Sequence, residues 1–183
     1  MTVLYKASDR CTDLILDFVA GGWTSPHDGK VHAMESGGNY NAVIGNAHST
    51  DPLERYNLAE IRLMQTGLIQ KGKPSSAIGR YQIVRATLDM LLDQARLDRR
   101  SMFTPELQDK LGWLLLCRRG YRAWWQGTLA ADIEFAHSLS LEWASLPDPQ
   151  NGGRSHYDGL AGNHAGCGLP DVLDMLKRAR ALQ

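Results

Sequence analysis

An acidic side chain stands where the chain is about to turn. Glu35 lies in the stretch HAMESGGNYNAV and is followed by Ser36 and two glycines. A carboxyl group that donates a proton near neutral pH needs a raised pKa, and partial burial against apolar groups provides it. Such a wall could come from the apolar neighbours in the sequence, Val31, Met34, Val43 and Ile44. The stretch therefore predicts a general acid at Glu35.

The segment before Glu35 is expected to be a helix. Ser25 and Pro26 are typical of a helix start, since proline fits the first helical position, and Gly37 and Gly38 are typical of a helix end. The negative end of that helix would raise the pKa of Glu35 further. Glutamate before a glycine pair is also common at ordinary helix ends, so the spacing alone leaves both interpretations open.

A second stretch, SSAIGRYQIVRATL, carries groups that suit a sugar. Tyr81 could offer a stacking face, and Gln82 a donor and an acceptor for hydroxyl and N-acetyl groups. Gly79 and Arg80 precede them at the entrance to an expected helix. The alternative is a helix start with a buried tyrosine.

Together these stretches resemble the lysozyme-like superfamily. ESGGNYNAV resembles the soluble lytic transglycosylase signature, and GRYQI resembles the glycine and glutamine motif of that group. The form GRYQ is still more similar to the lambda-phage endolysin family, as are YNAVIGN and WASLP (143–147). The resemblance covers residues 30–147. It implies a lysozyme-like fold that needs no cofactor and no metal.

The resemblance also implies a reaction, cleavage of the β-1,4 bond between N-acetylmuramic acid and N-acetylglucosamine in peptidoglycan. Glu35 would protonate the leaving oxygen and then accept the proton of the muramic 6-hydroxyl, giving a 1,6-anhydro product. Ser36 would contribute a neighbouring hydroxyl that faces the substrate, and Tyr81 and Gln82 would line the cleft. The usual third motif, Ala-Tyr-Asn, is absent, and GYRAWWQG (120–127) stands in the comparable region.

Asp51, in HSTDP, keeps a hydrolytic mechanism open. An inverting muramidase needs a second carboxylate about 6.5–9.5 Å from the acid to activate water, and Asp51 follows the expected hairpin. The alternative is Asp-Pro turn chemistry or an N-cap for a helix starting at Leu53. Two further candidates for substrate contact are Tyr40, in the expected hairpin, and Tyr157, beside His156 in the loop 148–169.

The expected architecture is α+β and mainly α, with residues 1–183 forming one lysozyme-like catalytic domain. A small lobe with a β-hairpin is expected at about 36–56, beside the cleft. Asn57 and Thr104-Pro105 predict helix starts, and Gly21-Gly22 a helix end. The expected helices are 8–20, 26–35, 58–72, 79–95, 105–119, 129–145 and 170–183.

The composition of the chain argues against several classes of function. The 20 basic and 20 acidic residues cancel, which disfavours nucleic-acid binding and attraction to an anionic membrane. Three dispersed cysteines favour reduced thiols. The six histidines show no zinc-ligand spacing, which disfavours a zinc peptidase. An inactive wall-binding module with a lysozyme fold is the other alternative.

The expected partner is the peptidoglycan glycan strand, bound by a monomer that does not insert into the membrane. The N-terminus is too acidic and too short in apolar residues for a signal peptide. We therefore expect synthesis in the host cytoplasm and action in the periplasm or cell wall after release through a holin pore.

Overall fold

The computed structural model describes residues 10–182, except for residues 33, 45–46, 48 and 128–130. Within these residues the chain has seven α-helices and one two-stranded antiparallel sheet, which confirms the expected class, α+β and mainly α. The elements are α1 (Arg10–Ala20), β1 (Trp23–Thr24), β2 (Val31–His32), η1 (Leu53–Arg55), α2 (Leu58–Gln70), α3 (Arg85–Ala95), α4 (Pro105–Arg118), α5 (Tyr121–Trp125), α6 (Asp132–Ser140), η2 (Pro149–Asn151) and α7 (Leu169–Arg180).

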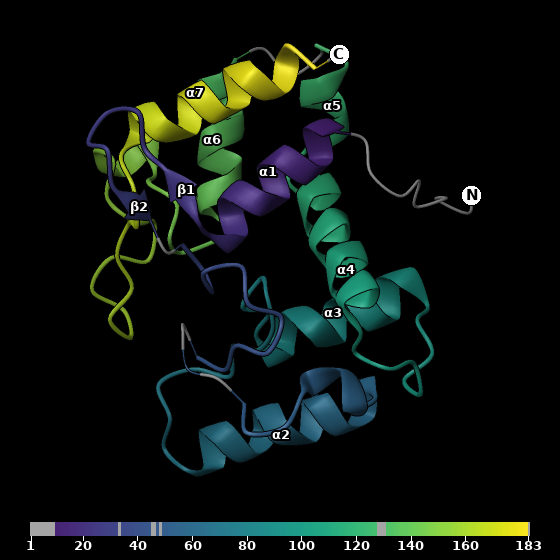
Figure 1. Ribbon diagram of the computed structural model, residues 1–183. Coiled ribbons are helices and arrows are strands. Elements are labelled where there is room, and N and C mark those ends of the chain that lie inside the picture. Colours follow the sequence, from purple (N-terminus) through teal and green to yellow (C-terminus); the bar gives the residue numbers. More distant parts are fainter. Residues whose placement is uncertain (1–9, 33, 45–46, 48, 128–130, 183) are drawn as a thin grey trace.

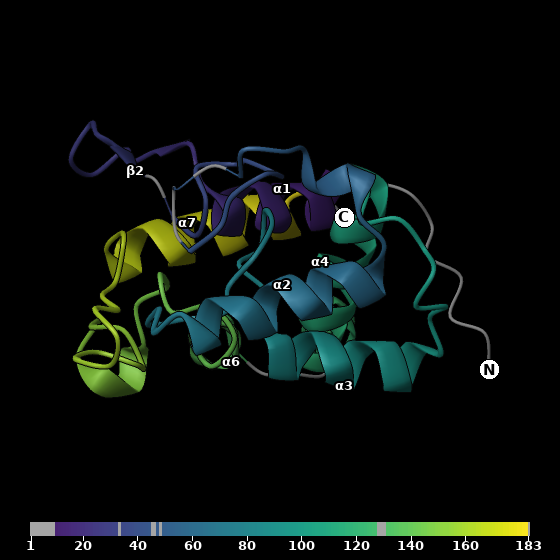
Figure 2. The same ribbon diagram turned by 90° about the horizontal axis from the view of Figure 1, so that it is seen from below.

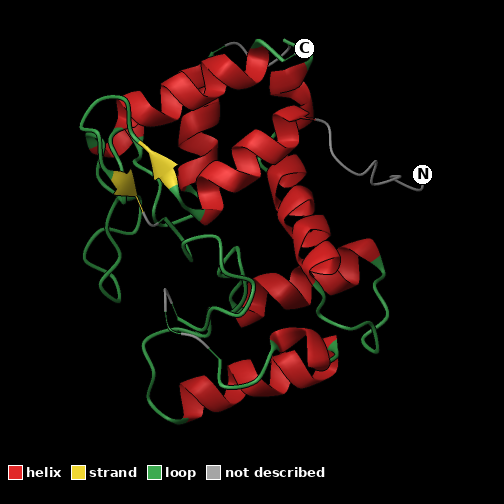
Figure 3. Ribbon diagram, in the orientation of Figure 1, coloured by secondary structure: helices red, strands yellow, loops and turns green. Residues whose placement is uncertain are grey.

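The helices form two groups joined by α4. Helices α1, α6 and α7 lie together with the β-hairpin at one end, and α2 and α3 lie together at the other (Figures 1, 2 and 3). Helix α1 packs against both α7 and α4. The largest fully buried side chains include Phe18, Trp124 and Trp143, so apolar burial holds the groups together.

Short sequence signals correctly predicted where several helices begin or end. Helix α1 ends at Ala20, directly before the glycine pair, although the expected cap at Ser8 lies outside the described residues. Asn57 forms a capping box with Glu60 at the start of α2. Thr104 accepts a hydrogen bond from the backbone of Leu107 at the start of α4. At these two starts a short polar side chain satisfies a free backbone N–H.

The expected helix over 26–35 is wrong. This segment belongs to a hairpin in which Trp23 pairs with His32 and Thr24 with Val31. The backbone N–H of His27 donates to Ser25 Oγ, and Gly29 has φ +70°. The sequence SPHDGK has the serine, proline, aspartate and glycine of a tight turn, and this turn chemistry prevails over the helix signal of the proline.

In the lobe at 36–56, the turn expected at Gly45-Asn46 lies outside the described residues. The chain on its two sides pairs as in a hairpin, because the N–H of Val43 donates to the carbonyl of Ala47 at 2.7 Å and that of Ser49 to the carbonyl of Asn41 at 2.9 Å. In the described part of that segment, Val43 forms an isolated bridge with Ile78, and no regular strand is present. The expected helix over 129–145 is shorter, since α6 ends at Ser140 and the chain then turns. None of the helices in the described residues has the length and apolarity needed to cross a membrane.

Candidate active site

The backbone at Glu35 is held by the end of helix α1. The N–H of Glu35 donates to the carbonyl of Val19 at 3.2 Å, and the N–H of Ser36 donates to that of Ala20 at 3.0 Å. Gly21 has φ +127°, and a Cβ there would lie 2.8 Å from Cα of Gly37. The negative end of α1 therefore lies at Glu35, in place of the end of the expected helix.

Glu35 is a partly exposed residue, and its carboxyl group contacts a residue far along the chain. Its Oε1 accepts hydrogen bonds from the backbone N–H of Ser145 at 3.0 Å and from the hydroxyl of Ser145 at 2.7 Å. Burial raises the pKa of Glu35, and the two hydrogen bonds from Ser145 oppose this only in part. The result is a carboxyl group biased toward its protonated form.

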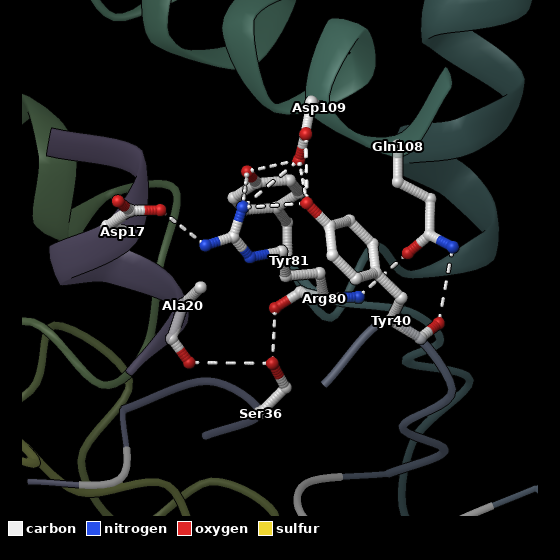
Figure 4. Close-up of polar contacts among 8 residues, drawn as sticks. All are labelled: Asp17, Ala20, Ser36, Tyr40, Arg80, Tyr81, Gln108 and Asp109. Atoms are coloured by element: carbon white, nitrogen blue, oxygen red, sulfur yellow. Dashed lines mark hydrogen bonds and ion pairs between the residues drawn. The ribbon is translucent and has the colours of Figure 1, made fainter. Parts of the chain in front are cut away.

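Ser36 links the two sequence motifs. Its hydroxyl donates to the carbonyl of Arg80 at 2.7 Å and lies 3.4 Å from the carbonyl of Ala20 (Figure 4). The residue is 3% exposed. The hydroxyl that was expected to face the substrate is therefore used inside the protein, where it joins the end of α1 to the GRYQ segment.

The GRYQ segment is fixed by Gln108 of helix α4. The N–H of Arg80 donates to Gln108 Oε1 at 2.9 Å, and Gln108 Nε2 donates to the carbonyls of Tyr40 and Phe103 at 3.2 Å each. Gly79 has φ +80°, and a Cβ there would lie 2.4 Å from Gln108 Oε1. The motif thus needs glycine because the Gln108 side chain approaches the backbone closely.

Arg80 lies at the centre of a charged network between helices α1 and α4 (Figure 4). Its guanidinium contacts Asp17 of α1 at 2.5 Å and Asp109 of α4 at 3.2 Å. It also donates to the hydroxyls of Tyr40 and Tyr81, at 3.0 Å and 3.1 Å. Nη2 contacts Asp17, and the two N–H groups of Nη1 are shared among Tyr40, Tyr81 and Asp109. One side chain therefore connects three segments of the chain.

The two tyrosines donate to Asp109. The hydroxyl of Tyr81 lies 2.8 Å from Asp109 Oδ1, and that of Tyr40 lies 2.9 Å from both oxygens. Tyr81 is 2% exposed and its ring lies on Gly112, so the alternative of a buried tyrosine is confirmed and the open stacking face is wrong. Burial, together with the hydrogen bond to Asp109, raises the pKa of Tyr40 to about 12.

The remaining candidates lie apart from this network. Gln82 is partly exposed, donates to the carbonyl of Gly79 at 2.9 Å and lines a small cavity with Trp143. The hydroxyl of Tyr157 donates to the carbonyl of Leu141 at 2.8 Å. Asp51 is exposed and accepts from the hydroxyl of Tyr56 at 3.3 Å. In the described part of the chain, no cluster of three His, Cys, Asp or Glu side chains could hold a metal ion.

Sequence reasoning missed Ser145, Gln108 and Asp109. Ser145 lies within WASLP, so its segment was recognised but its contact with Glu35 was not. Gln108 and Asp109 follow one another in a helix, where polar residues usually face solvent. Their roles depend on which segments the fold brings opposite that helix.

Comparison with known proteins gives one family. The family model described as Endolysin matches residues 29–164, about three quarters of the chain. The match includes Glu35, Arg80, Asp109 and Ser145. Neither a curated protein nor a solved structure matches the chain.

Proposed function

Since this chain belongs to the endolysin family and is a phage enzyme that degrades peptidoglycan, we propose that it acts as a lytic transglycosylase with Glu35 as its acid and base. The observation that carries this proposal is the state of the Glu35 carboxyl group. The Glu35 residue is partly exposed, burial raises the pKa of its carboxyl group, and the described side-chain partner of that group is an uncharged serine. A proton donor for a glycosidic oxygen needs this combination of access and protonation.

The proposed reaction uses one carboxyl group twice. The proton of Glu35 passes to the glycosidic oxygen while the bond from that oxygen to C1 of the muramic residue breaks. The carboxylate then takes the proton of the 6-hydroxyl, and the 6-oxygen bonds to C1. Glu35 is protonated again at the end, and no water is consumed.

Among the other candidates, Gln82 is the better placed for substrate contact, because it is partly exposed beside a cavity. Tyr40 and Tyr157 are proposed to shape the edges of the cleft rather than to stack on a sugar. We further propose a single catalytic domain that works as a monomer on the cell wall and is released through a holin pore.

Digestion of purified peptidoglycan followed by mass analysis tests the reaction. Transglycosylation gives anhydro-muropeptides, which are one water lighter than the products of hydrolysis. Products with reducing muramic ends would overturn the proposal and favour the muramidase mechanism with Asp51. Cleavage within the stem peptides alone would overturn both glycosidase mechanisms.

A further inference from the structure

Ser145 presents two donors to one oxygen of Glu35. Its N–H lies 3.0 Å and its hydroxyl 2.7 Å from Oε1, and Oε2 accepts no hydrogen bond within the described residues. When the acid is protonated, the carbonyl oxygen is the better acceptor for two donors, and Oε1 is the oxygen that accepts both bonds. The proton then resides on Oε2.

The position of Ser145 is itself fixed by the end of the long loop. The N–H of Gly166 donates to the carbonyl of Ser145 at 2.7 Å, and Nδ1 of His32 lies 2.6 Å from the carbonyl of Gly166. A Cβ at Gly166 would lie 3.2 Å from Sδ of Met34. A continuous chain of hydrogen bonds therefore links strand β2, this loop and Ser145.

We infer that Ser145 is a positioning residue for the reaction, which holds Oε1 so that Oε2 is the oxygen that gives and takes the proton. The inference rests on the proposed role of Glu35. Oε2 protonates the glycosidic oxygen as the bond to C1 breaks, and the same Oε2 accepts the proton of the 6-hydroxyl as the ring closes. A single oriented oxygen serves both steps without rotation of the carboxyl group.

The same two hydrogen bonds balance the effect of burial. Hydrogen bonds donated to a carboxylate stabilise its charged form, whereas burial penalises that form. Glu35 must lose its proton in the first step and regain one in the second, so a carboxyl group held only by burial would be a poor proton donor. Loss of the serine hydroxyl would raise the pKa of Glu35 further.

The substitution Ser145→Ala tests the inference, with Ser140→Ala as its matched control. Ser140 is 0% exposed, and its hydroxyl also makes one hydrogen bond, to the carbonyl of His137 at 2.7 Å. Both variants lose one such bond, but Ser140 has no described contact with Glu35. Rates are measured on soluble glycan strands of defined length across a pH series, alongside Glu35→Gln.

For Ser145→Ala we expect kcat to fall by about 10- to 100-fold, as for a misplaced reacting group, with little change in KM. The descending limb of its pH profile should move to higher pH, because Glu35 stays protonated longer. Ser140→Ala should keep the parental kcat and pH profile. If Ser145→Ala matches Ser140→Ala in both while Glu35→Gln is inactive, the positioning role is wrong. If Glu35→Gln is active, the proposed function itself has failed.

Discussion

Ser36 links two polar regions, one around Arg80 and one around Glu35, and these regions have opposite effects on the protonation of their carboxyl groups. Around Arg80, the carboxylates of Asp17 and Asp109 share a cation, and Asp109 also accepts hydrogen bonds from tyrosines. Around Glu35, the described partner of the carboxyl group is a neutral serine. A paired carboxylate is stable in its charged form, whereas an unpaired and partly buried one favours its neutral form.

The two regions therefore differ in role: the Arg80 network stabilises the fold, and the Glu35 region suits proton transfer. The Arg80 network ties α1 to α4 and to the segment at Tyr40, so its charges hold fixed positions. Glu35 lies one residue from Ser36, whose hydroxyl reaches the Arg80 backbone. The Arg80 network thus fixes the backbone next to Glu35 but places no cation beside the Glu35 carboxyl group.

The largest expected effect is on activity at Glu35. Glu35→Gln should lower the rate of peptidoglycan cleavage by about 10²–10⁴-fold, because the amide cannot donate an acidic proton. Its fold should persist, since the glutamine oxygen can accept the hydrogen bonds of Ser145. Activity is measured by wall lysis and product analysis, and folding by circular dichroism. Lysis at near-parental rates would contradict the acid and base assignment.

Removal of the cation should mainly affect stability. Arg80→Met is expected to lower the free energy of unfolding by about 2 kcal/mol, because Asp109 and the hydroxyls of Tyr40 and Tyr81 lose a charged hydrogen-bond donor. Arg62→Met is the control, because Arg62 is more exposed than Arg80, 29% against 14%, and its one described ion pair is with Asp89, so the loss should be below about 1 kcal/mol. Urea unfolding gives both values. Equal losses of unfolding free energy in the two variants would mean that the Arg80 network contributes no more to stability than an ordinary ion pair.

A smaller change at Tyr40 distinguishes the network from a substrate contact. Tyr40→Phe keeps the ring over Arg80, 5.0 Å from its guanidinium carbon, but removes the hydroxyl that donates to Asp109. We expect a loss of about 1–2 kcal/mol in unfolding free energy, with KM for soluble glycan unchanged. An increased KM at parental stability would show instead that the hydroxyl binds substrate.

The sequence was informative where the signal was local. Asn57 and Thr104 identify helix starts because each caps a backbone only three residues away. SPHDGK was misassigned because a proline fits both a helix start and a turn, and pairing of β1 with β2 decides between them. The spacing of apolar residues along the sequence carries no information about that strand pairing.

In the candidate site, too, the local motif could be predicted from the sequence and the long-range contacts could not. Glu35 could be singled out because its motif is contiguous in sequence. Its partner Ser145 lies 110 residues away, and Asp109 meets Tyr81 only because α4 packs beside the GRYQ segment. Such contacts depend on how helices pack, which no local pattern specifies. For this reason the sequence leaves open whether Tyr81 is exposed or buried, and packing against Gly112 of α4 makes it buried.

The contrast between the regions should also appear in the pH dependence of stability. The pKa of Glu35 is raised above its usual 4.5 in the folded protein, so the fold binds that proton more tightly and loses stability as pH rises from about 4.5 through the folded pKa. Glu35→Gln should therefore gain stability relative to the parent as pH increases from about 4 to about 7, as measured by urea unfolding at each pH. A constant difference would contradict the raised pKa.

The smallest effect is expected at Asp51, and it decides between the two mechanisms. Asp51 is exposed and contacts Tyr56, whereas a carboxylate that activates water must face the acid across the substrate. If Glu35 acts alone, Asp51→Asn should retain near-parental activity and the same anhydro products in the mass analysis.

The opposite outcome has its own signature. A large loss of activity in a folded Asp51→Asn, with reducing ends formed by the parent, would make Asp51 the base of a hydrolase. The substitution Asp51→Glu then separates a chemical role from a structural one, because it keeps the carboxylate but lengthens the side chain at the Asp-Pro turn. Partial activity in Asp51→Glu, beside an inactive Asp51→Asn, would mean that the carboxylate itself is required. Equal activity in both variants and the parent is what a single acid and base at Glu35 requires.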